Sequence, residues 1–195
     1  MDLSLADWRE QTARLYLSDR SLDQFRAARD AMFRDHPQSP LADPAGFGGL
    51  PYHPPASFQC ECTVQQSADS GDEGIDVGTG GEDGVLRYRR LGGVETPWGP
   101  LTLYWIAAYG GGLFLPFRDG TSGDTTYGGG RYLTDTVKGT FGRGVTLLGR
   151  DRVRLDFDYA YNPSCAYDSR WACPLPPPEN WLAARIEAGE LAPPG

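Results

Sequence analysis

Residues 113–133 read Leu-Phe-Leu-Pro-Phe-Arg-Asp-Gly-Thr-Ser-Gly-Asp-Thr-Thr-Tyr-Gly-Gly-Gly-Arg-Tyr-Leu. Aromatic, charged and glycine residues are interleaved here more densely than a plain hydrophobic core requires. Glycine permits positive φ and lets another group approach the backbone closely. The stretch therefore predicts either demanding turn geometry between short strands or a binding site built beside those turns.

The composition of the whole chain favours short strands and many turns. Its 195 residues include 26 glycines and 16 prolines, and 39% of the residues are hydrophobic. Too few residues remain for a helix bundle. The length is typical of one domain, so residues 1–195 are expected to fold as a single unit.

Six short apolar segments, separated by glycine-rich turns, lie from residue 85 onward, and a seventh lies before residue 85. They are residues 58–65, 85–90, 101–108, 113–117, 131–137, 145–148 and 153–161. Several short antiparallel strands behind a helical segment are typical of an open or closed barrel. The predicted fold class is therefore α+β and mainly β, with a helical prefix packed on an antiparallel β-barrel-like sheet.

The first 35 residues form the helical prefix. Apolar residues recur at three-four spacing from residue 3 to residue 34, with charges between them. Residues 18–21 can break the pattern, and Ser21 with Gln24 resembles a capping box. His36 precedes a proline, which ends the pattern. The prefix is either two helices or one bent helix.

Two segments between the helical prefix and the β core lack periodicity. Residues 36–57 contain six prolines and predict an extended strap. Residues 66–84 are rich in Asp, Glu and Gly and predict a solvated acidic loop. The β core and a proline-rich tail then occupy residues 85–190.

The charge balance excludes some partners. The net charge is −8, from 26 acidic and 18 basic residues. Nucleic acids and anionic membranes attract cationic surfaces, so neither is expected as a partner. The start has no signal-peptide pattern, and the apolar window 101–117 is interrupted by glycine and proline. The protein is therefore expected to be cytoplasmic, with its four cysteines as thiols.

The chain contains many short sequence motifs, called words below, whose identity and order resemble those of the DUF1684 family of uncharacterised bacterial and archaeal proteins. The words are Phe25-Arg-Ala-Ala-Arg-Asp30, His36-Pro-Gln-Ser-Pro-Leu41, Phe117-Arg-Asp119, Thr121-Ser-Gly123, Thr126-Tyr127, Gly130-Arg-Tyr-Leu133, Asp156-Phe157, Ala160-Tyr-Asn-Pro163, Cys165-Ala-Tyr167, Cys173-Pro174, Glu179-Asn180 and Ala188-Gly-Glu190. The chain departs from the pattern at Asp158, where the family usually has Asn, and at Gly120, where it often has Ala. The resemblance covers nearly the whole chain but implies no reaction.

The glycine-rich stretch supplies the candidate ligand-binding residues. Two arginines beside such turns can clamp a carboxylate or phosphate with bidentate hydrogen bonds. The candidates are Arg118, Asp119, Thr126, Tyr127, Arg131 and Tyr132. The alternative is that the same charges form a buried salt-bridge network that locks a hairpin.

Asp156 is a candidate catalytic residue. In a strand over residues 153–161, Asp156 and Asp158 lie on the same side. Facing a lumen, they would form an acid/base pair with one raised pKa. Facing water, they would be surface charges opposed by Arg152 and Arg154.

The cysteines have no zinc-site spacing, so no metal site is predicted. Cys165 could act as a nucleophile with His36 as its base. The alternative is a set of buried, inert thiols. A disulfide between Cys165 and Cys173 is sterically conceivable, but a cytoplasmic redox potential disfavours it.

Together these patterns favour a small anionic metabolite bound at the mouth of a β-barrel. The alternatives are a metabolite-processing enzyme that uses Asp156 or the Cys165/His36 pair, and a structural or interaction protein without a ligand. The sequence has no recognisable nucleotide, flavin or haem motif, and it leaves the cofactor, enzyme activity and oligomeric state undetermined.

Overall fold

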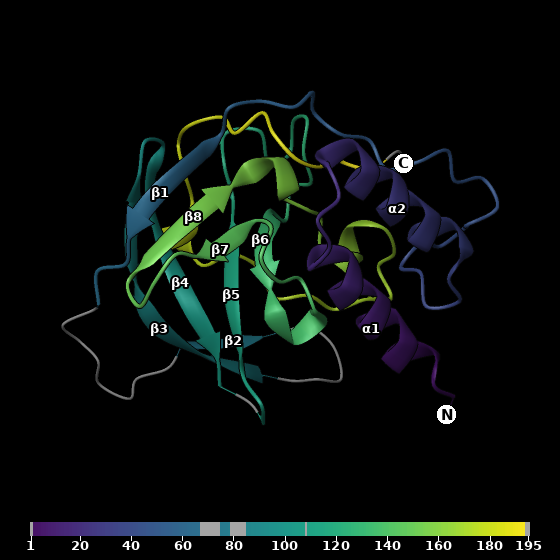
Figure 1. Ribbon diagram of the computed structural model, residues 1–195, viewed down its shortest axis with the longest axis horizontal. Helices are drawn as coiled ribbons and strands as arrows, with labels where there is room; N and C mark the ends of the chain where they lie inside the picture. The colour runs from purple at the N-terminus through teal and green to yellow at the C-terminus, as the bar shows by residue number, and fades with distance from the viewer. Residues whose placement is uncertain (1, 67–74, 79–84, 108, 194–195) are drawn as a thin grey trace.

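Two helices and two antiparallel sheets make up the fold (Figure 1). The computed structural model describes residues 2–66, 75–78, 85–107 and 109–193. The helices are α1 (Ser4–Tyr16) and α2 (Leu22–Asp35). The strands are β1 (Gln59–Thr63), β2 (Ile75–Gly78), β3 (Val85–Thr96), β4 (Gly99–Ile106), β5 (Gly112–Phe117), β6 (Arg131–Asp135), β7 (Val145–Leu147) and β8 (Arg152–Asp156).

The predicted break in the helical prefix is confirmed. The hydroxyl of Ser21 accepts a hydrogen bond from the backbone N–H of Gln24, and the Gln24 side chain accepts one from the backbone of Ser21. This capping box starts α2, which ends at Asp35, directly before His36 and its following proline. Neither helix has the length and hydropathy that crossing a membrane requires.

The strands form a three-stranded sheet in the order β1-β8-β7 and a five-stranded sheet in the order β2-β3-β4-β5-β6. A bulge between Arg90 and Gly92 bends the long strand β3. Beside this bulge, Gln65 and Gly93 exchange two backbone hydrogen bonds and so connect the two sheets. Within the described residues, the ladders define two sheets, which confirms a mainly β fold and leaves a closed barrel unconfirmed.

Two predicted strands end earlier than their apolar pattern suggested. The Asp135 carboxylate accepts a hydrogen bond from the backbone of Lys138, and a 3-10 turn replaces the end of the strand predicted over 131–137. The Asp156 carboxylate accepts one from the backbone of Asp158 and likewise ends β8. Aspartate competes with sheet pairing because its short carboxylate binds nearby N–H groups.

Part of the predicted acidic loop is a strand. Residues 75–78 form β2, which pairs antiparallel with residues 85–88 of β3. The remainder of the segment 66–84, apart from Gln66, lies outside the described residues. The alternation of Ile75 and Val77 with polar neighbours is short, and the acidic composition around it obscured the strand.

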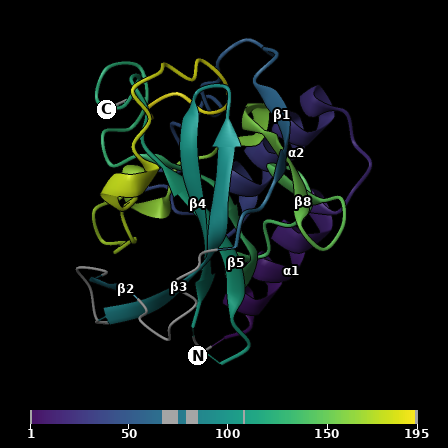
Figure 2. The ribbon, with the colours of Figure 1, turned by 90° about the vertical axis from the view of Figure 1, so that its left-hand side faces the viewer.

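Two hydrophobic clusters fill the interior. The first packs side chains of both sheets against one another: Cys62, Val94, Leu101, Leu103, Leu115, Phe117, Leu133, Val145, Val153, Leu155 and Phe157, with Ala160, Leu182, Ile186 and Ala188 of the following segments. The second joins the helices to the five-stranded sheet and consists mainly of aromatic rings: Leu15, Tyr16, Phe25, Tyr88, Tyr104, Ile106, Phe114, Tyr132 and Tyr161. Figures 1 and 2 show both helices on one side of the molecule, away from β2 and β3.

The proline-rich tail is part of the folded structure. The buried Asn180 accepts a hydrogen bond from the backbone of Thr102 and donates to the carbonyls of Thr102 and Pro116. One side chain therefore satisfies backbone groups of both β4 and β5.

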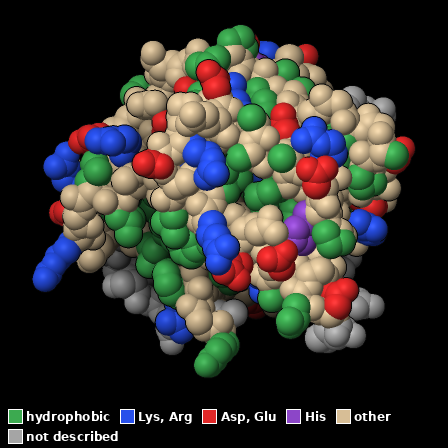
Figure 3. All heavy atoms as spheres, turned by 45° about the vertical axis from the view of Figure 1, so that its right-hand side comes forward, with side chains coloured by type: hydrophobic (Ala, Val, Ile, Leu, Met, Phe, Trp, Pro, Cys, Tyr) green, Lys and Arg blue, Asp and Glu red, His purple; other side chains and the backbone are tan. Residues whose placement is uncertain are grey.

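On the face shown in Figure 3, acidic and basic side chains are interspersed among small groups of hydrophobic ones.

The segment that leads into β7 passes directly against β6. At Gly144, an added Cβ would overlap the carbonyl oxygen of Leu133. The Gly144 carbonyl also accepts a hydrogen bond from the Asp156 backbone at 2.9 Å. The lack of a side chain at Gly144 therefore allows the end of the three-stranded sheet to lie against the five-stranded sheet.

We expect Gly144→Ala to lower the free energy of unfolding by about 2 kcal/mol or more, because the obstacle is backbone and cannot rotate away. Denaturant unfolding followed by circular dichroism measures the change. Gly149→Ala is the matched control, since nothing lies within 4 Å of a Cβ added there. Equal stabilities of the two variants would contradict the close approach.

Candidate functional site

Arg131 and Asp119 form an ion pair in the interior. Arg131 begins β6 opposite Phe117 of β5, and Asp119 follows β5 by two residues. The distance between Arg131 Nη2 and Asp119 Oδ2 is 2.7 Å, and the side chains are 1% and 0% exposed. Asp119 Oδ1 accepts a hydrogen bond from the Thr121 backbone at 2.8 Å. Gly130, at φ 90°, provides the left-handed turn that leads into Arg131.

Arg131 also binds the backbone of the C-terminal segment. Nη1 donates to the carbonyls of Ala188 and Glu190, and Nη2 donates to the carbonyl of Ile186 at 2.9 Å. Burial lowers the pKa of Arg131, and the Asp119 carboxylate acts in the opposite direction. Both terminal nitrogens therefore have partners within the protein, as a buried charge requires.

A second buried ion pair attaches α2 to the same segment. Arg29 Nε donates to Glu190 Oε1 at 2.7 Å, and these side chains are 9% and 1% exposed. Glu190 Oε2 accepts from the Asn162 backbone at 2.7 Å and from the Tyr167 hydroxyl at 2.6 Å. The Arg29 guanidinium lies 4.6 Å from the centre of the Phe33 ring. Burial opposes the charge of Arg29, but the Glu190 carboxylate and nearby tyrosines raise its pKa overall.

The sequence did not indicate this second pair. Glu190 appears in the family-like word at residues 188–190, but Arg29 lies 161 positions away. No spacing pattern connects positions so far apart. Arg29 and Glu190 each lie in a family-like motif, but nothing in the sequence paired the two motifs.

The turn between β5 and β6 holds two more of the predicted ligand-binding residues. The hydroxyls of Thr126 and Thr121 are 2.8 Å apart, and Thr121 also bonds to Asp119. Arg118 instead packs its guanidinium over the Trp181 ring, 4.8 Å from the ring centre. Thr126 is thus joined to the ion pair through Thr121, whereas Arg118 contacts the tail.

The two predicted tyrosines contact the segment 165–174. The Tyr127 hydroxyl donates to Cys165 Sγ at 3.7 Å. The Tyr132 hydroxyl donates to the carbonyl of Pro174 at 2.5 Å, and this side chain is buried. Each hydroxyl therefore has a partner within the protein, and the two partners are different.

Asp156 and Asp158 have separate environments. Asp156 Oδ2 accepts from Gln59 Nε2 at 2.9 Å, while the Asp158 carboxylate accepts from the Ala56 backbone at 3.1 Å. The strand expected to align them ends at Asp156. Burial raises the pKa of Asp156 from 3.8 to about 6, and the charge of Asp158 adds to the effect. Asp156 can therefore exchange a proton near neutral pH.

His36 and Cys165 contact different groups. His36 Nε2 lies 3.0 Å from Asp7 Oδ2, and Nδ1 accepts from the backbone of Gln38 at 3.0 Å. Both ring nitrogens are thus engaged near the N-terminus, whereas Cys165 contacts Tyr127 and Cys173. In the described part of the chain, no three His, Cys, Asp or Glu side chains are grouped to hold a metal ion.

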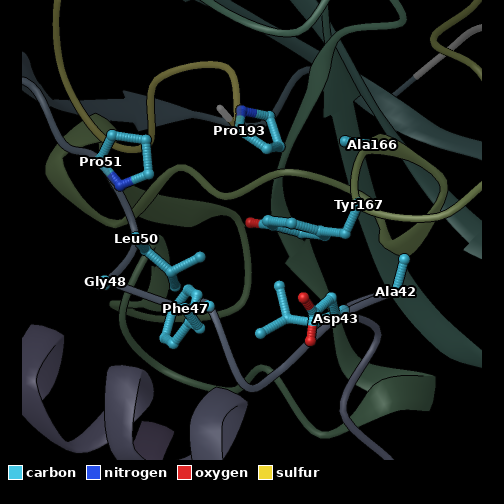
Figure 4. Close-up of a pocket in the computed structure, with 12 residues that line it drawn as sticks. Ala42, Asp43, Phe47, Gly48, Leu50, Pro51, Ala166, Tyr167 and Pro193 are labelled. Carbon is cyan, nitrogen blue, oxygen red and sulfur yellow. The ribbon is translucent and has the colours of Figure 1, made fainter. Parts of the chain in front are cut away.

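A pocket lies between the proline-rich strap and the segment after Cys165. Its volume is about 560 Å³. The lining residues are Leu41, Ala42, Asp43, Gly46, Phe47, Gly48, Gly49, Leu50, Pro51, Ala166, Tyr167 and Pro193. Figure 4 shows the Tyr167 ring extending across this space, with Leu50, Phe47 and Pro51 on the strap side. We refer to it as the strap pocket; the proline-rich sequence of residues 36–57 predicted only an extended connection there.

We expect Asp119→Asn to lower the free energy of unfolding by about 3–5 kcal/mol, because it leaves Arg131 buried without its counter-charge. Denaturant unfolding without any ligand measures the loss. The control is Glu61→Gln, at an exposed carboxylate that binds Arg152 and Arg154, where solvent screens the charges and a much smaller loss is expected. Similar losses in both variants would show that the buried pair is not structural.

Asp156 should make stability depend on pH. Its raised pKa means that the folded protein binds the proton more tightly than the unfolded chain. That contribution is complete below pH 3.8 and is lost as the pH rises through about 6. Relative to that of wild type, the free energy of unfolding of Asp156→Asn should rise by about 1 kcal/mol as the pH increases from about 4 to about 7.5, allowing for partial exposure. Parallel stability curves for the two proteins would contradict this.

Comparisons with known proteins agree with the resemblance of the sequence words. No curated protein matches the chain. The solution NMR structure of an uncharacterized protein of Haloarcula marismortui matches with 33% identity and a TM-score of 0.60, covering 98% of this chain and 97% of that one. The model of the family described as "Protein of unknown function (DUF1684)" matches residues 45–191. The chain therefore belongs to the DUF1684 family.

Proposed function

We propose that the protein binds a small, mainly apolar molecule in the strap pocket. The observation that supports this is a pocket of about 560 Å³ with walls of aliphatic, aromatic and glycine residues. Small-molecule sites are typically concave, mainly apolar and 300–1,000 Å³ in volume. The pocket is large enough for a metabolite with one or two rings.

The charge of the lining favours a neutral or cationic ligand. Among the described residues that line the pocket, Asp43 is the one with a charged side chain. Its carboxylate accepts a hydrogen bond from the backbone of Ala45 at 3.0 Å and is exposed. A carboxylate at the pocket wall repels an anion and attracts a cation. The Tyr167 hydroxyl is already bonded to Glu190, so the ring face is the part of Tyr167 available to a ligand.

The network of Arg29 and Glu190 supports the wall of the pocket. Glu190 fixes the Tyr167 hydroxyl, and Asp30, the next residue in α2, accepts a hydrogen bond from the Leu50 backbone at 3.2 Å. Both walls are thus anchored to α2 or to its ion pair. A pocket with fixed walls needs little ordering when a ligand binds.

An anion site around Arg118 and Arg131, at the mouth of a barrel, stays a prediction. We favour the strap pocket because an anion at Arg131 would have to displace Asp119 or the tail carbonyls from the terminal nitrogens. The enzyme alternative retains one observation in its favour, the raised pKa of Asp156. A bell-shaped pH profile for any turnover, abolished in Asp156→Asn, would support that alternative.

Screening a fragment library tests the binding proposal. We expect neutral or cationic ring compounds to raise the Tm of the wild-type protein, because a ligand that binds only the folded state stabilises it. In Gly48→Leu, a side chain enters a position that lines the pocket and has open space at its Cβ, so the shift should disappear. Ligand-observed NMR of the same compounds with wild type and with Gly48→Leu provides an independent measurement of binding.

Gly149→Leu is the matched control, because its Cβ also meets open space and the residue lies outside the pocket lining. It should keep the full ligand-induced shift. Equal shifts in wild type and Gly48→Leu would place the binding elsewhere. Stabilisation by anions alone, lost in Arg118→Ala, would favour the anion site instead.

A further inference from the structure

Cys165 and Cys173 lie together beside a short 3-10 turn. The turn spans Ser164–Ala166, and the backbone N–H of Cys165 donates to Cys173 Sγ at 3.4 Å. Cys173 is 6% exposed, whereas Cys165 is partly exposed. Both are free thiols. The pair therefore has one partly exposed cysteine and one buried cysteine.

The surroundings of Cys173 favour its thiolate. The interaction with the Cys165 thiol lowers the pKa of Cys173 to about 6, although burial opposes this. The positive charge of Lys138 and the backbone N–H groups of Ser164 and Cys165 act in the same direction as Cys165. The hydrogen bond with Cys173 raises the pKa of Cys165, and burial adds to this effect. Deprotonation of the pair is therefore favoured at Cys173.

The other two cysteines lack this arrangement. The sulfurs of Cys60 and Cys62 are 3.5 Å apart. However, burial raises the pKa of Cys60 to about 12, and the hydrogen bond with Cys62 adds to this effect. They are two residues apart in β1, whose register against β8 is fixed. Alternate residues of a strand have Cα atoms about 6.6 Å apart, near the upper limit for a disulfide. This pair is a control within the same molecule.

We propose that Cys165 and Cys173 form a reversible dithiol–disulfide pair, in which Cys165 meets an external small-molecule disulfide and Cys173 completes the exchange. In the first step, the Cys173 thiolate takes the proton of Cys165, whose sulfur bonds to one sulfur of the external disulfide as the S–S bond breaks and a small thiolate leaves. The small thiolate then takes that proton from Cys173 and leaves as a thiol. In the second step, the Cys173 thiolate attacks the Cys165 sulfur and releases the second small thiolate.

The exchange is balanced without a further reactant. Two cysteine sulfurs lose two electrons in total, and the external disulfide gains them and becomes one thiol and one thiolate. The new bond closes the loop between residues 165 and 173. Ala166 and Tyr167, the next residues after Cys165, line the strap pocket. The exchange does not require a ligand in that pocket.

Oxidised glutathione, added to the folded full-length protein near pH 7.5, tests the pair. Free thiols are then blocked with N-ethylmaleimide, and the unreduced protein is digested with trypsin for mass spectrometry. Cleavage after Arg154, Arg170 and Arg185 separates Cys165 from Cys173 and leaves Cys60 and Cys62 in one peptide. We expect peptides 155–170 and 171–185 to be joined by a disulfide that dithiothreitol reverses.

Two variants separate the steps. Cys173→Ala should accumulate a glutathione adduct on Cys165 about tenfold above wild type, because nothing displaces the glutathione. Cys165→Ala should react about tenfold more slowly than wild type, because Cys173 is buried. Circular dichroism confirms that each variant is folded. Joined peptides that appear only in denaturant would overturn the proposal, as would equal adduct levels in wild type and Cys173→Ala.

Discussion

Moving the Arg131 guanidinium out of water costs several kcal/mol, and much of the fold is arranged around offsetting that cost. Asp119 supplies the opposite charge, and three carbonyls of the C-terminal segment accept the remaining hydrogen bonds of the terminal nitrogens. These contacts require the β5–β6 turn and residues 186–190 to be in place together. The Arg131 side chain thus supplies hydrogen-bond donors to backbone carbonyls of the C-terminal segment, as a neighbouring strand does within a sheet.

Glu190 extends this dependence to the helices. Its carbonyl binds Arg131, and its carboxylate binds Arg29 of α2 and the Tyr167 hydroxyl. One residue of the tail thus connects the five-stranded sheet, the helical layer and the wall of the strap pocket. The pocket is consequently not an independent loop feature, since its shape depends on the same buried charges that hold the core together.

The sequence predicted those parts of the fold that depend on local chemistry. The capping box at Ser21 and the proline after His36 define where α2 starts and ends, and both act within a few residues. The predicted strand ends at residues 137 and 161 were wrong, because the carboxylates of Asp135 and Asp156 bind the backbone ahead of them and end the strands there. Strand β2 was also missed, since four residues in an acidic stretch carry too short a pattern to recognise.

For the candidate site, too, the sequence indicated local residue types but not contacts between distant segments. The residue types around Arg131 indicated either a ligand clamp or a buried network, and sequence alone could not choose because the two use identical side chains. The pairing of Arg29 with Glu190 and the strap pocket join segments that are distant along the chain. Neither could be predicted without the three-dimensional arrangement, because periodicity reports only on neighbours within a few turns.

The position of residues 186–190 has a consequence for the nascent protein on the ribosome. Synthesis makes α2 and β6 first, and each must wait for a segment that emerges much later, in the case of Arg29 for a partner 161 residues downstream. Until then Arg29 lacks its counter-charge, and Arg131, although Asp119 is made before it, lacks the three carbonyls of residues 186–190. Neither guanidinium can therefore be fully satisfied in the interior at that stage. The two buried networks can therefore be completed only after residues 186–190 have left the exit tunnel.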